Sequence, residues 1–573
     1  MKKMLVYLRD YKKESILAPL FKLLEALFDL FVPLVVASII NDGIANNDFN
    51  LIIRRFVLLI VLALVGLGCS IVAQYFAAKA SIGYTTKLRQ ALFDHIQTLS
   101  YRELDKIGAD TLITRMTSDT NQIQNGLNLA LRLLLRSPFI VFGAMIMAFT
   151  IDVKCGLIFA VVIPLLCLVV FFIMIKSIPL FKKVQKALDG LLSKTRENLI
   201  GIRVIRAFRI EDKEVDEFTK QNEILTSENN RVGFLSALTN PLTYILINIA
   251  TVVLIYVGAI RVEMGQISQG NVVALYNYMA QIVVELVKMA NLIITIDKSL
   301  ACLSRTKNIL EQESSMTYGE IEDGDSDEAI RFDNVEFAYA DSLPCLTNIS
   351  FSLKKGETLG IIGPTGCGKT TLVNLIARFY DASSGAVYVD GVNVKEYKEG
   401  VLLDKIGIVP QKAVLFKDTI RNNLKVSKED ASDEEIWRAL DIAQASEIVK
   451  GKEGELDCLI EQGGKNLSGG QKQRMTIARA LLKDSEIVIL DDSFSALDYA
   501  TEAKLRKALN SLHKTIVNVS QRASTIKHAD KILVLEDGKM VGFGNHDSLI
   551  KDCETYKEIY YSQYPDEKGE TND

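Results

Sequence analysis

Histidine and tryptophan are scarce in this chain of 573 residues, which has 4 histidines and 1 tryptophan. So few imidazoles exclude a histidine-rich metal site. The 8 cysteines are scattered, with no pair at the spacing of a metal-binding or redox motif, so we expect reduced, structural thiols. The chain also lacks a large excess of charge of either sign. The net charge is −4, and no basic field indicates a nucleic-acid partner.

Apolar residues, by contrast, are abundant. They make up 49% of the chain, the mean hydropathy is +0.18, and the excess lies almost wholly before residue 300. Six runs there approach the ~20 apolar residues that span a bilayer. Buried core helices of a soluble protein would explain one such run, but not six. The predicted spans are roughly 16–40, 54–78, 128–150, 155–178, 236–260 and 271–296.

Two connections between the predicted spans are long, charged and helical in composition. They cover 83–124 and 182–231, and we interpret them as membrane helices that continue into the cytoplasm, turn and return. Both carry many Lys and Arg, as does the basic, amphipathic N-terminus. This pattern predicts a multi-pass protein of the cell membrane with both termini in the cytoplasm. We place the turning points at 108–115 and 207–212, either docked on the second half of the chain or as solvated loops.

Charged residues inside the predicted spans are unexpected, because a charge in hydrocarbon is costly. Two interpretations stay open. The charges form a polar lining for a translocation path, or they form ion pairs within the bundle and reach the membrane surface near span ends. The residues are Lys22, Glu25, Asp29, Arg132, Arg136, Glu285 and Lys288.

An acidic stretch with interspersed Gly and Ser, 320–328, is typical of a linker. After it, the pattern changes to short β-type runs and polar helices. We therefore divide the chain into a transmembrane domain (1–315), a linker (316–328), a second domain (329–562) and a polar tail (563–573).

The second domain contains a P-loop pattern, G-x-x-x-x-G-K-[ST]. Its glycines permit backbone turns that point successive N–H groups into one hollow. An apolar run at 358–362 is typical of the preceding strand, and 371–376 of the following helix. We expect Lys369 to reach the β- and γ-phosphates of ATP and the Thr370 hydroxyl to ligate Mg²⁺. The predicted nucleotide contacts are Gly363, Pro364, Thr365, Gly366, Cys367, Gly368, Lys369, Thr370 and Thr371.

Further motifs accompany the P-loop. Four apolar residues lead into Asp491, which predicts a buried strand that presents a carboxylate to Mg²⁺. Gln411 follows another strand-like run, and Tyr339 either stacks on adenine or simply packs in its strand. An Ala-Leu-Asp run ends at Asp498. The remaining run is Leu467, Ser468, Gly469, Gly470 and Gln471, here called the signature.

Together and in this order, these motifs resemble the nucleotide-binding domain of ATP-binding cassette (ABC) proteins. With six spans ahead of it, the chain resembles a half-size ABC exporter of the multidrug type over all but its polar tail. The resemblance implies a multi-domain membrane protein, with a six-helix transmembrane domain followed by an α/β P-loop ATPase domain. It also implies that the two turning points are coupling helices.

The resemblance further implies a dimer. Two nucleotide-binding domains meet head to tail, and each ATP lies between the P-loop of one chain and the signature of the other. On this basis Ser468, Gly469 and Gly470 offer donors to the partner's nucleotide, and Asp498 lies in a loop between the domains. Gln411 would join Thr370 and Asp491 around Mg²⁺.

Two catalytic positions depart from the family pattern. Asp492 stands where the family has the Glu that polarises the attacking water. Its carboxylate is one methylene shorter, and a displacement of about 1 Å can cost on the order of a hundredfold in rate. Gln521 replaces the switch histidine, and an amide can hydrogen-bond but cannot carry the imidazole's charge.

We therefore predict one subunit of a heterodimeric exporter of amphiphiles (drug, lipid or peptide). Its own site would hydrolyse ATP slowly, while its intact signature would serve a partner that carries the consensus Glu and His. The alternatives are a homodimeric exporter with low turnover and an ATP-gated regulatory membrane protein. The predicted ligands are ATP, Mg²⁺ and membrane lipid.

Overall fold

The computed structural model describes residues 2–339, 343–565 and 567, so most of the predicted polar tail lies outside the described residues. The chain divides into two compact units. The helical unit is Met1–Gln97 with Asp110–Gln312, and the α/β unit is Thr98–Ala109 with Glu313–Asp573.

Within the described residues, six helical segments are long and apolar enough to span a bilayer, which confirms the number predicted from the sequence. A helix satisfies its backbone N–H and C=O groups internally, as hydrocarbon requires. The elements are η1 (Lys2–Tyr11), α1 (Lys12–Ser38), η2 (Ile39–Ile44), α2 (Phe49–Thr98), α4 (Ala109–Thr114), η3 (Arg115–Asp119), α5 (Thr120–Leu133), α6 (Arg136–Ile151), α7 (Val153–Ile200), α8 (Ile202–Phe208), α9 (Glu211–Ala237), α10 (Thr239–Glu263) and α11 (Gln269–Leu310).

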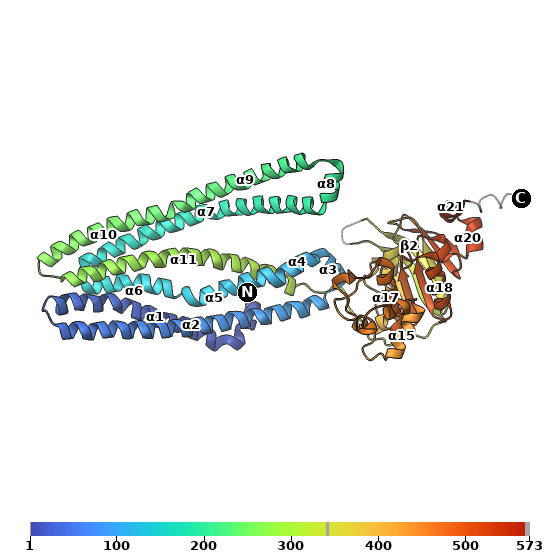
Figure 1. The fold of residues 1–573 in the computed structure, drawn as a ribbon, viewed down its shortest axis with the longest axis horizontal. Helices are drawn as coiled ribbons and strands as arrows, with labels where there is room; N and C mark the ends of the chain where they lie inside the picture. The colour runs from blue at the N-terminus through green and yellow to red at the C-terminus, as the bar shows by residue number, and fades with distance from the viewer. Residues whose placement is uncertain (1, 340–342, 566, 568–573) are drawn as a thin grey trace. The chain divides into compact units, whose positions relative to one another are not determined.

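The turning segments are short helices. In Figure 1, α8 joins the ends of α7 and α9, which lie side by side. The other is α3 (Tyr101–Ile107), which ends at Gly108 with φ of 80°, while α8 ends at Arg209 with φ of 54°. Our sequence-based positions, 108–115 and 207–212, fall several residues too late. Turn residues mark the C-terminal end of a short helix rather than its middle.

The helix α3 belongs to the α/β unit, where it packs on two aromatic residues. The Tyr101 and Phe379 ring centroids lie 4.6 Å apart, and the Tyr380 hydroxyl donates a hydrogen bond to Asp105. Packing between aromatic rings, together with a hydrogen bond from a tyrosine hydroxyl, is a stable way to dock a short helix. The first turning segment is thus docked rather than a solvated loop.

The α/β unit contains two sheets among the described residues. A smaller sheet has the strand order β2-β1-β4-β5, and a larger one has the order β10-β9-β3-β8-β7-β6. The strands are β1 (Glu328–Phe337), β2 (Leu346–Lys354), β3 (Thr358–Ile362), β4 (Ser384–Val389), β5 (Val392–Asn393), β6 (Ile406–Val409), β7 (Ile487–Asp491), β8 (Thr515–Val519), β9 (Lys531–Glu536) and β10 (Lys539–Gly544).

The larger sheet is parallel from β9 to β6, and its strands are apolar and buried, as expected for a sheet covered on both faces. The helices of this unit are α3, α12 (Lys369–Ile376), α13 (Val401–Asp404), α14 (Ile420–Lys425), α15 (Asp433–Ile442), α16 (Ser446–Lys450), η4 (Glu455–Asp457), η5 (Gln462–Gly464), α17 (Gly469–Leu482), α18 (Tyr499–Asn510), α19 (Ala523–Ile526), α20 (His546–Asp552) and α21 (Glu554–Gln563).

Most of the charged residues predicted inside the spans form one network, centred on Arg136 of α6. Its guanidinium donates to Glu285 at 2.8 Å and to Asp29 at 3.0 Å, so it connects α1, α6 and α11. Glu25 lies 3.8 Å from the same guanidinium and pairs with Lys22. These ion pairs offset the cost of placing charges at this depth.

The two remaining charged residues of the predicted spans are Lys288 and Arg132. Lys288 donates to Glu285 at 2.9 Å, and this pair spans three residues of α11. Arg132 has a buried Nε with no hydrogen-bond partner among the described residues.

We predict that Arg136→Met destabilises the protein by about 3 kcal/mol, the low end for breaking a buried ion pair. Glu285 would keep Lys288, whereas Asp29 would lose its guanidinium partner. Thermal unfolding in detergent would measure the change. Arg196→Met is the matched control, because its pair with Asp110 is exposed on both sides and should contribute no more than about 1 kcal/mol. Equal shifts for the two variants would contradict the prediction.

Candidate nucleotide-binding site

Four neighbouring parallel strands bring the predicted motifs together. β3, β8, β7 and β6 are adjacent in the larger sheet and run in the same direction. The P-loop follows β3, the switch loop (Ser520–Thr525) follows β8, Asp491 ends β7, and Gln411 follows β6. Ligands bind at the carboxyl ends of such strands, so segments distant in the sequence meet at one edge.

The P-loop turns from β3 into α12, as the sequence predicts. Gly368 has φ of 99°, a conformation that favours glycine, and a Cβ there would lie 2.7 Å from Leu346. Lys369 is 9% exposed, and its ammonium donates to the carbonyls of Gly363 at 2.8 Å and Pro364 at 2.7 Å. The cation is therefore held within the loop that the pattern assigns to phosphates.

Thr370 and Asp491 face each other beside Lys369. The Thr370 hydroxyl donates to Asp491 Oδ1 at 3.2 Å, and Asp491 is 4% exposed. Burial raises the pKa of Asp491, and the neighbouring charge of Asp492 adds to this, while Thr370 and Lys369 oppose it. Hydroxyl and carboxylate oxygens are ligands that Mg²⁺ accepts, together with substrate phosphates. These two residues fit a Mg²⁺ site that phosphate oxygens would complete.

Asp492, Gln411 and Gln521 line the same pocket. Burial raises the pKa of Asp492, and a hydrogen bond from Gln411 and the charges of Lys369 and Arg522 oppose that rise. Asp492 also has φ of 48°, in the left-handed region where Asp and Asn are better tolerated than most residues. The two departures from the family pattern thus lie together beside the proposed phosphate position.

Two side chains on the β1–β2 connection contact Thr371 of the P-loop, and one of them, Cys345, lines this pocket, which has a volume of about 200 Å³. The Tyr339 hydroxyl lies 3.1 Å from Thr371 Oγ1, and its ring packs edge-on against Phe337 and Tyr380. Cys345, which sequence reasoning missed, has its sulfur 3.4 Å from the same Thr371 oxygen. No local pattern points to Cys345, because only the fold of the β1–β2 hairpin brings it to the P-loop.

The signature lies at the start of α17, outside this pocket. Ser468 and Gln471 form a capping box: the Ser468 hydroxyl accepts from the Gln471 N–H, and the Gln471 side chain accepts from the Ser468 N–H. A Cβ on Gly470 would lie 2.8 Å from the Ala496 carbonyl, whereas one on Gly469 would meet open space. A helix N-terminus with an open glycine is suited to an approaching anion.

Asp498 caps α18, since its carboxylate accepts from the Thr501 N–H at 3.0 Å. That hydrogen bond lowers the pKa of Asp498. This local role accounts for an aspartate at the position without reference to a partner.

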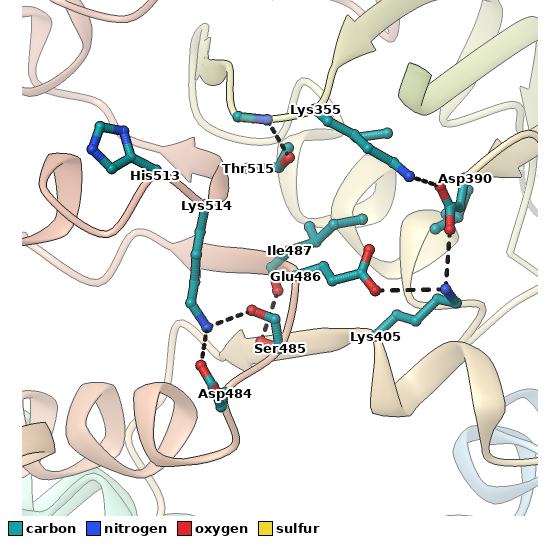
Figure 2. Close-up of a pocket in the computed structure, with 13 residues that line it drawn as sticks. Lys355, Asp390, Lys405, Asp484, Ser485, Glu486, Ile487, His513, Lys514 and Thr515 are labelled. Atoms are coloured by element: carbon teal, nitrogen blue, oxygen red, sulfur yellow. Dashed lines mark hydrogen bonds and ion pairs between the residues drawn. The ribbon is translucent and has the colours of Figure 1, made fainter. Parts of the chain in front are cut away.

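Figure 2 shows a larger hollow, of about 310 Å³, at the opposite, amino-terminal ends of β6, β7 and β8. Its lysines are all paired with carboxylates. Lys514 donates to Asp484 at 2.7 Å, Lys355 pairs with Asp390, and Lys405 donates to Asp390 at 3.0 Å. We interpret it as an ion-pair cluster, because no cation is left for a ligand.

The acidic stretch predicted as a linker is bonded to this side of the α/β unit. Asp323 accepts from Lys405 at 2.6 Å, Glu322 pairs with Lys398, and the Ile321 N–H donates to the Glu396 carbonyl at 3.1 Å. Composition identified the stretch as polar, but the lysines that bind it lie more than seventy residues later in the sequence.

A P-loop, a strand-end aspartate with a threonine ligand, and a separate signature helix define an ABC-type ATPase. Comparison with known proteins supports this class. The family model for the ABC transporter transmembrane region matches residues 15–286, and the ABC transporter model matches residues 346–495. The chain belongs to the ABC transporters, and because both units share one polypeptide it is a half-size exporter whose ATPase activity is coupled to transport.

The relatives and one solved structure agree with this assignment. The chain is 36% identical to the uncharacterized ABC transporter ATP-binding protein YfiB of Bacillus subtilis over 573 residues, 100% of both chains. It is 29% identical to the ATP-dependent lipid A-core flippase of Photorhabdus laumondii, covering 96% of this chain and 95% of that one. A bacterial Atm1-family ABC exporter with ATP bound has the same fold, with a TM-score of 0.82, 22% identity, and coverage of 96% and 99%.

We predict that Asp492→Asn stabilises the nucleotide-free protein at pH 7.5 by on the order of 1 kcal/mol, as is common when an active-site conflict is removed. Burial raises the folded-state pKa of Asp492, so folded wild-type protein loses stability as pH rises through that pKa and its carboxylate ionises. The stability advantage of Asp492→Asn over the wild type should therefore shrink as pH falls. Thermal unfolding of both proteins across pH 5–8 would test this.

The control is Asp498→Asn. The Thr501 N–H lowers the pKa of Asp498, so the charged carboxylate stabilises the folded protein above the unfolded-state pKa. The effect on stability is therefore opposite to that at Asp492, and Asp498→Asn should not stabilise the protein at pH 7.5. A pH-independent difference between wild type and Asp492→Asn would contradict the assigned cause.

Proposed function

We propose that this chain is one subunit of a heterodimeric exporter in the cell membrane, with both termini in the cytoplasm. The observation that carries the proposal is the combination of Asp492 and Gln521 in the chain's own pocket with an intact signature at the start of α17. A chain that lacks two catalytic groups and keeps its signature is suited to serving a partner's ATP.

In the chain's own site, Lys369 would exchange its two carbonyl partners for β- and γ-phosphate oxygens. Thr370 and Asp491 would hold Mg²⁺, which neutralises phosphate charge when bound. Binding also relieves the repulsion between the buried carboxylate of Asp491 and the partly buried one of Asp492, since Mg²⁺ would then face them. The site would bind ATP well.

Hydrolysis at that site would be slow. Asp492 is one methylene shorter than Glu, so a water between it and the γ-phosphate is displaced by about 1 Å, worth on the order of a hundredfold. Gln521 can orient a phosphate oxygen through its amide but brings no positive charge. ATP bound here would act mainly as a clamp between subunits.

The partner's ATP would meet this chain's signature. The open Gly469 lies in the first turn of α17, where backbone N–H groups would point to a γ-phosphate. We propose that the partner supplies Glu and His at positions equivalent to Asp492 and Gln521. The helices α3 and α8 would transmit closure to the spans, which would change from inward- to outward-facing.

We propose an amphiphile as cargo. One relative is named as a lipid A-core flippase, and lipids combine an apolar body with a charged head. The Arg136 network offers a charged surface among apolar spans, because Asp29 and Lys288 are each more than two-fifths exposed. These two residues are the ones most suited to contact a charged head group.

We predict unequal effects of removing the acidic residue from the two sites of the purified pair. Replacing the partner's Glu with Gln should lower ATPase activity by more than about tenfold, whereas Asp492→Asn should change it by less than about twofold. Cargo uptake into inverted vesicles should follow the same order. Equal losses would overturn the heterodimer proposal.

We also predict that restoring both consensus residues activates this chain when purified alone. The double variant Asp492→Glu and Gln521→His should raise its ATPase rate on the order of tenfold or more, because it returns a general base and a cation. Adding Lys369→Ala is the control and should abolish the gain. If the wild-type chain alone hydrolyses ATP rapidly and moves cargo, it works as a homodimer.

A further inference from the structure

The C-terminal helix α21 ends against the switch loop. The side-chain amide of its last residue, Gln563, donates to the Gln521 carbonyl at 2.8 Å and accepts from the Ala523 N–H at 2.8 Å. A Gln side chain offers a donor and an acceptor, and here both are used on backbone groups two residues apart. The contact therefore fixes the backbone on either side of Arg522.

The position of Gln563 is set by aromatic packing. Tyr556 and Tyr560 of α21 are buried against Ala523 and Ile526 of α19. The Tyr556 hydroxyl also lies 2.8 Å from Nδ1 of His546. Although the Gln563 side chain is itself exposed, its helix is anchored, so the two hydrogen bonds need little further ordering.

The opposite side of the switch loop is tied to the loop that leads to Asp498. Arg522 donates to the carbonyls of Ser495 at 3.2 Å and Leu497 at 3.3 Å. It also donates to Glu502, a 2% exposed carboxylate that accepts from Thr525 at 2.6 Å as well. A displacement of the switch loop must therefore move the Ser495–Leu497 backbone or break charge-assisted hydrogen bonds.

We propose that Gln563 is a positioning residue for ATP turnover. It holds the switch loop and, through Arg522, sets the Ser495–Asp498 loop that lies next to the signature glycine Gly470. The signature serves the ATP that the partner binds, so Gln563 acts on the site that carries most of the turnover. Gln563 does not line the nucleotide pocket of its own chain, so it acts through the loops alone. The proposal rests on the proposed function in one respect, namely that this signature serves the partner's ATP.

The test uses Gln563→Met, which keeps the side-chain stem and removes both hydrogen bonds. In the full-length transporter, kcat for ATP hydrolysis should fall about 3- to 10-fold, the factor expected for one or two ordinary hydrogen bonds, with KM within about twofold. In Gln563→Glu, kcat should fall at least as far, because the variant loses the donor and places a carboxylate against the Gln521 carbonyl. The melting temperature should stay unchanged, since Gln563 is exposed.

Ser562→Ala is the matched control. Ser562 is the preceding residue of the same helix, and its hydroxyl donates only to the Ile559 carbonyl of that helix. It should leave kcat and KM unchanged. If Ser562→Ala lowers kcat as much as Gln563→Met does, or if Gln563→Met lowers kcat only together with the melting temperature, α21 is merely structural and the proposal is wrong.

Amide hydrogen exchange gives a readout that does not depend on ATP. Without the acceptor, the Ala523 amide should exchange about 5-fold faster in Gln563→Met, while Ser562→Ala leaves it unchanged. Unchanged exchange would overturn the positioning role. A wild-type protein that neither binds nor hydrolyses ATP, but shows the faster exchange in the variant, would instead contradict the proposed function.

Discussion

Asp491 and Asp492 stand side by side at the end of β7, a strand whose five residues are all buried. Two adjacent carboxylates in such a place repel each other and are poorly solvated, so the surrounding groups must compensate. Four residues from three segments do so: Thr370 and Lys369 from the P-loop, Gln411 from the end of β6, and Arg522 from the switch loop. The parallel sheet is what brings these four groups to the same edge.

The same arrangement assigns ATP binding and hydrolysis to different residues. ATP binding needs a cation for the phosphates and a carboxylate for Mg²⁺. Lys369 occupies the first of these positions and Asp491 the second. Hydrolysis additionally needs a base at the correct distance from the γ-phosphate, and residue 492 occupies a left-handed backbone conformation where a short, polar side chain is better tolerated. A short, polar side chain is thus compatible with the backbone conformation at residue 492.

Much of this could be predicted from sequence, because the features concerned are local. The spans follow from apolar length, and the strand, loop and helix around Lys369 follow from glycine and apolar spacing. Other features depend on residues distant in the chain. Cys345 reaches the P-loop only through a hairpin, and Gln563 binds backbone groups about forty residues earlier, which leave no side-chain pattern to detect. The turning helices were misplaced because their turn residues mark helix ends.

In the helical unit the charges are neutralised in the same way, but with a mechanical consequence. Arg136 ties α1, α6 and α11 together through Asp29 and Glu285, and a broken pair in hydrocarbon costs more than one at the surface. These three helices should therefore move as one body during transport. By contrast, α10 is joined to the start of α7 by an ion pair between Arg261 and Asp152, and it packs otherwise through apolar residues such as Leu254 and Ile247. Apolar contacts can slide at little cost in lipid, so α7 and α10, which are paired with each other but have no share in the Arg136 network, are freer to move relative to α1, α6 and α11.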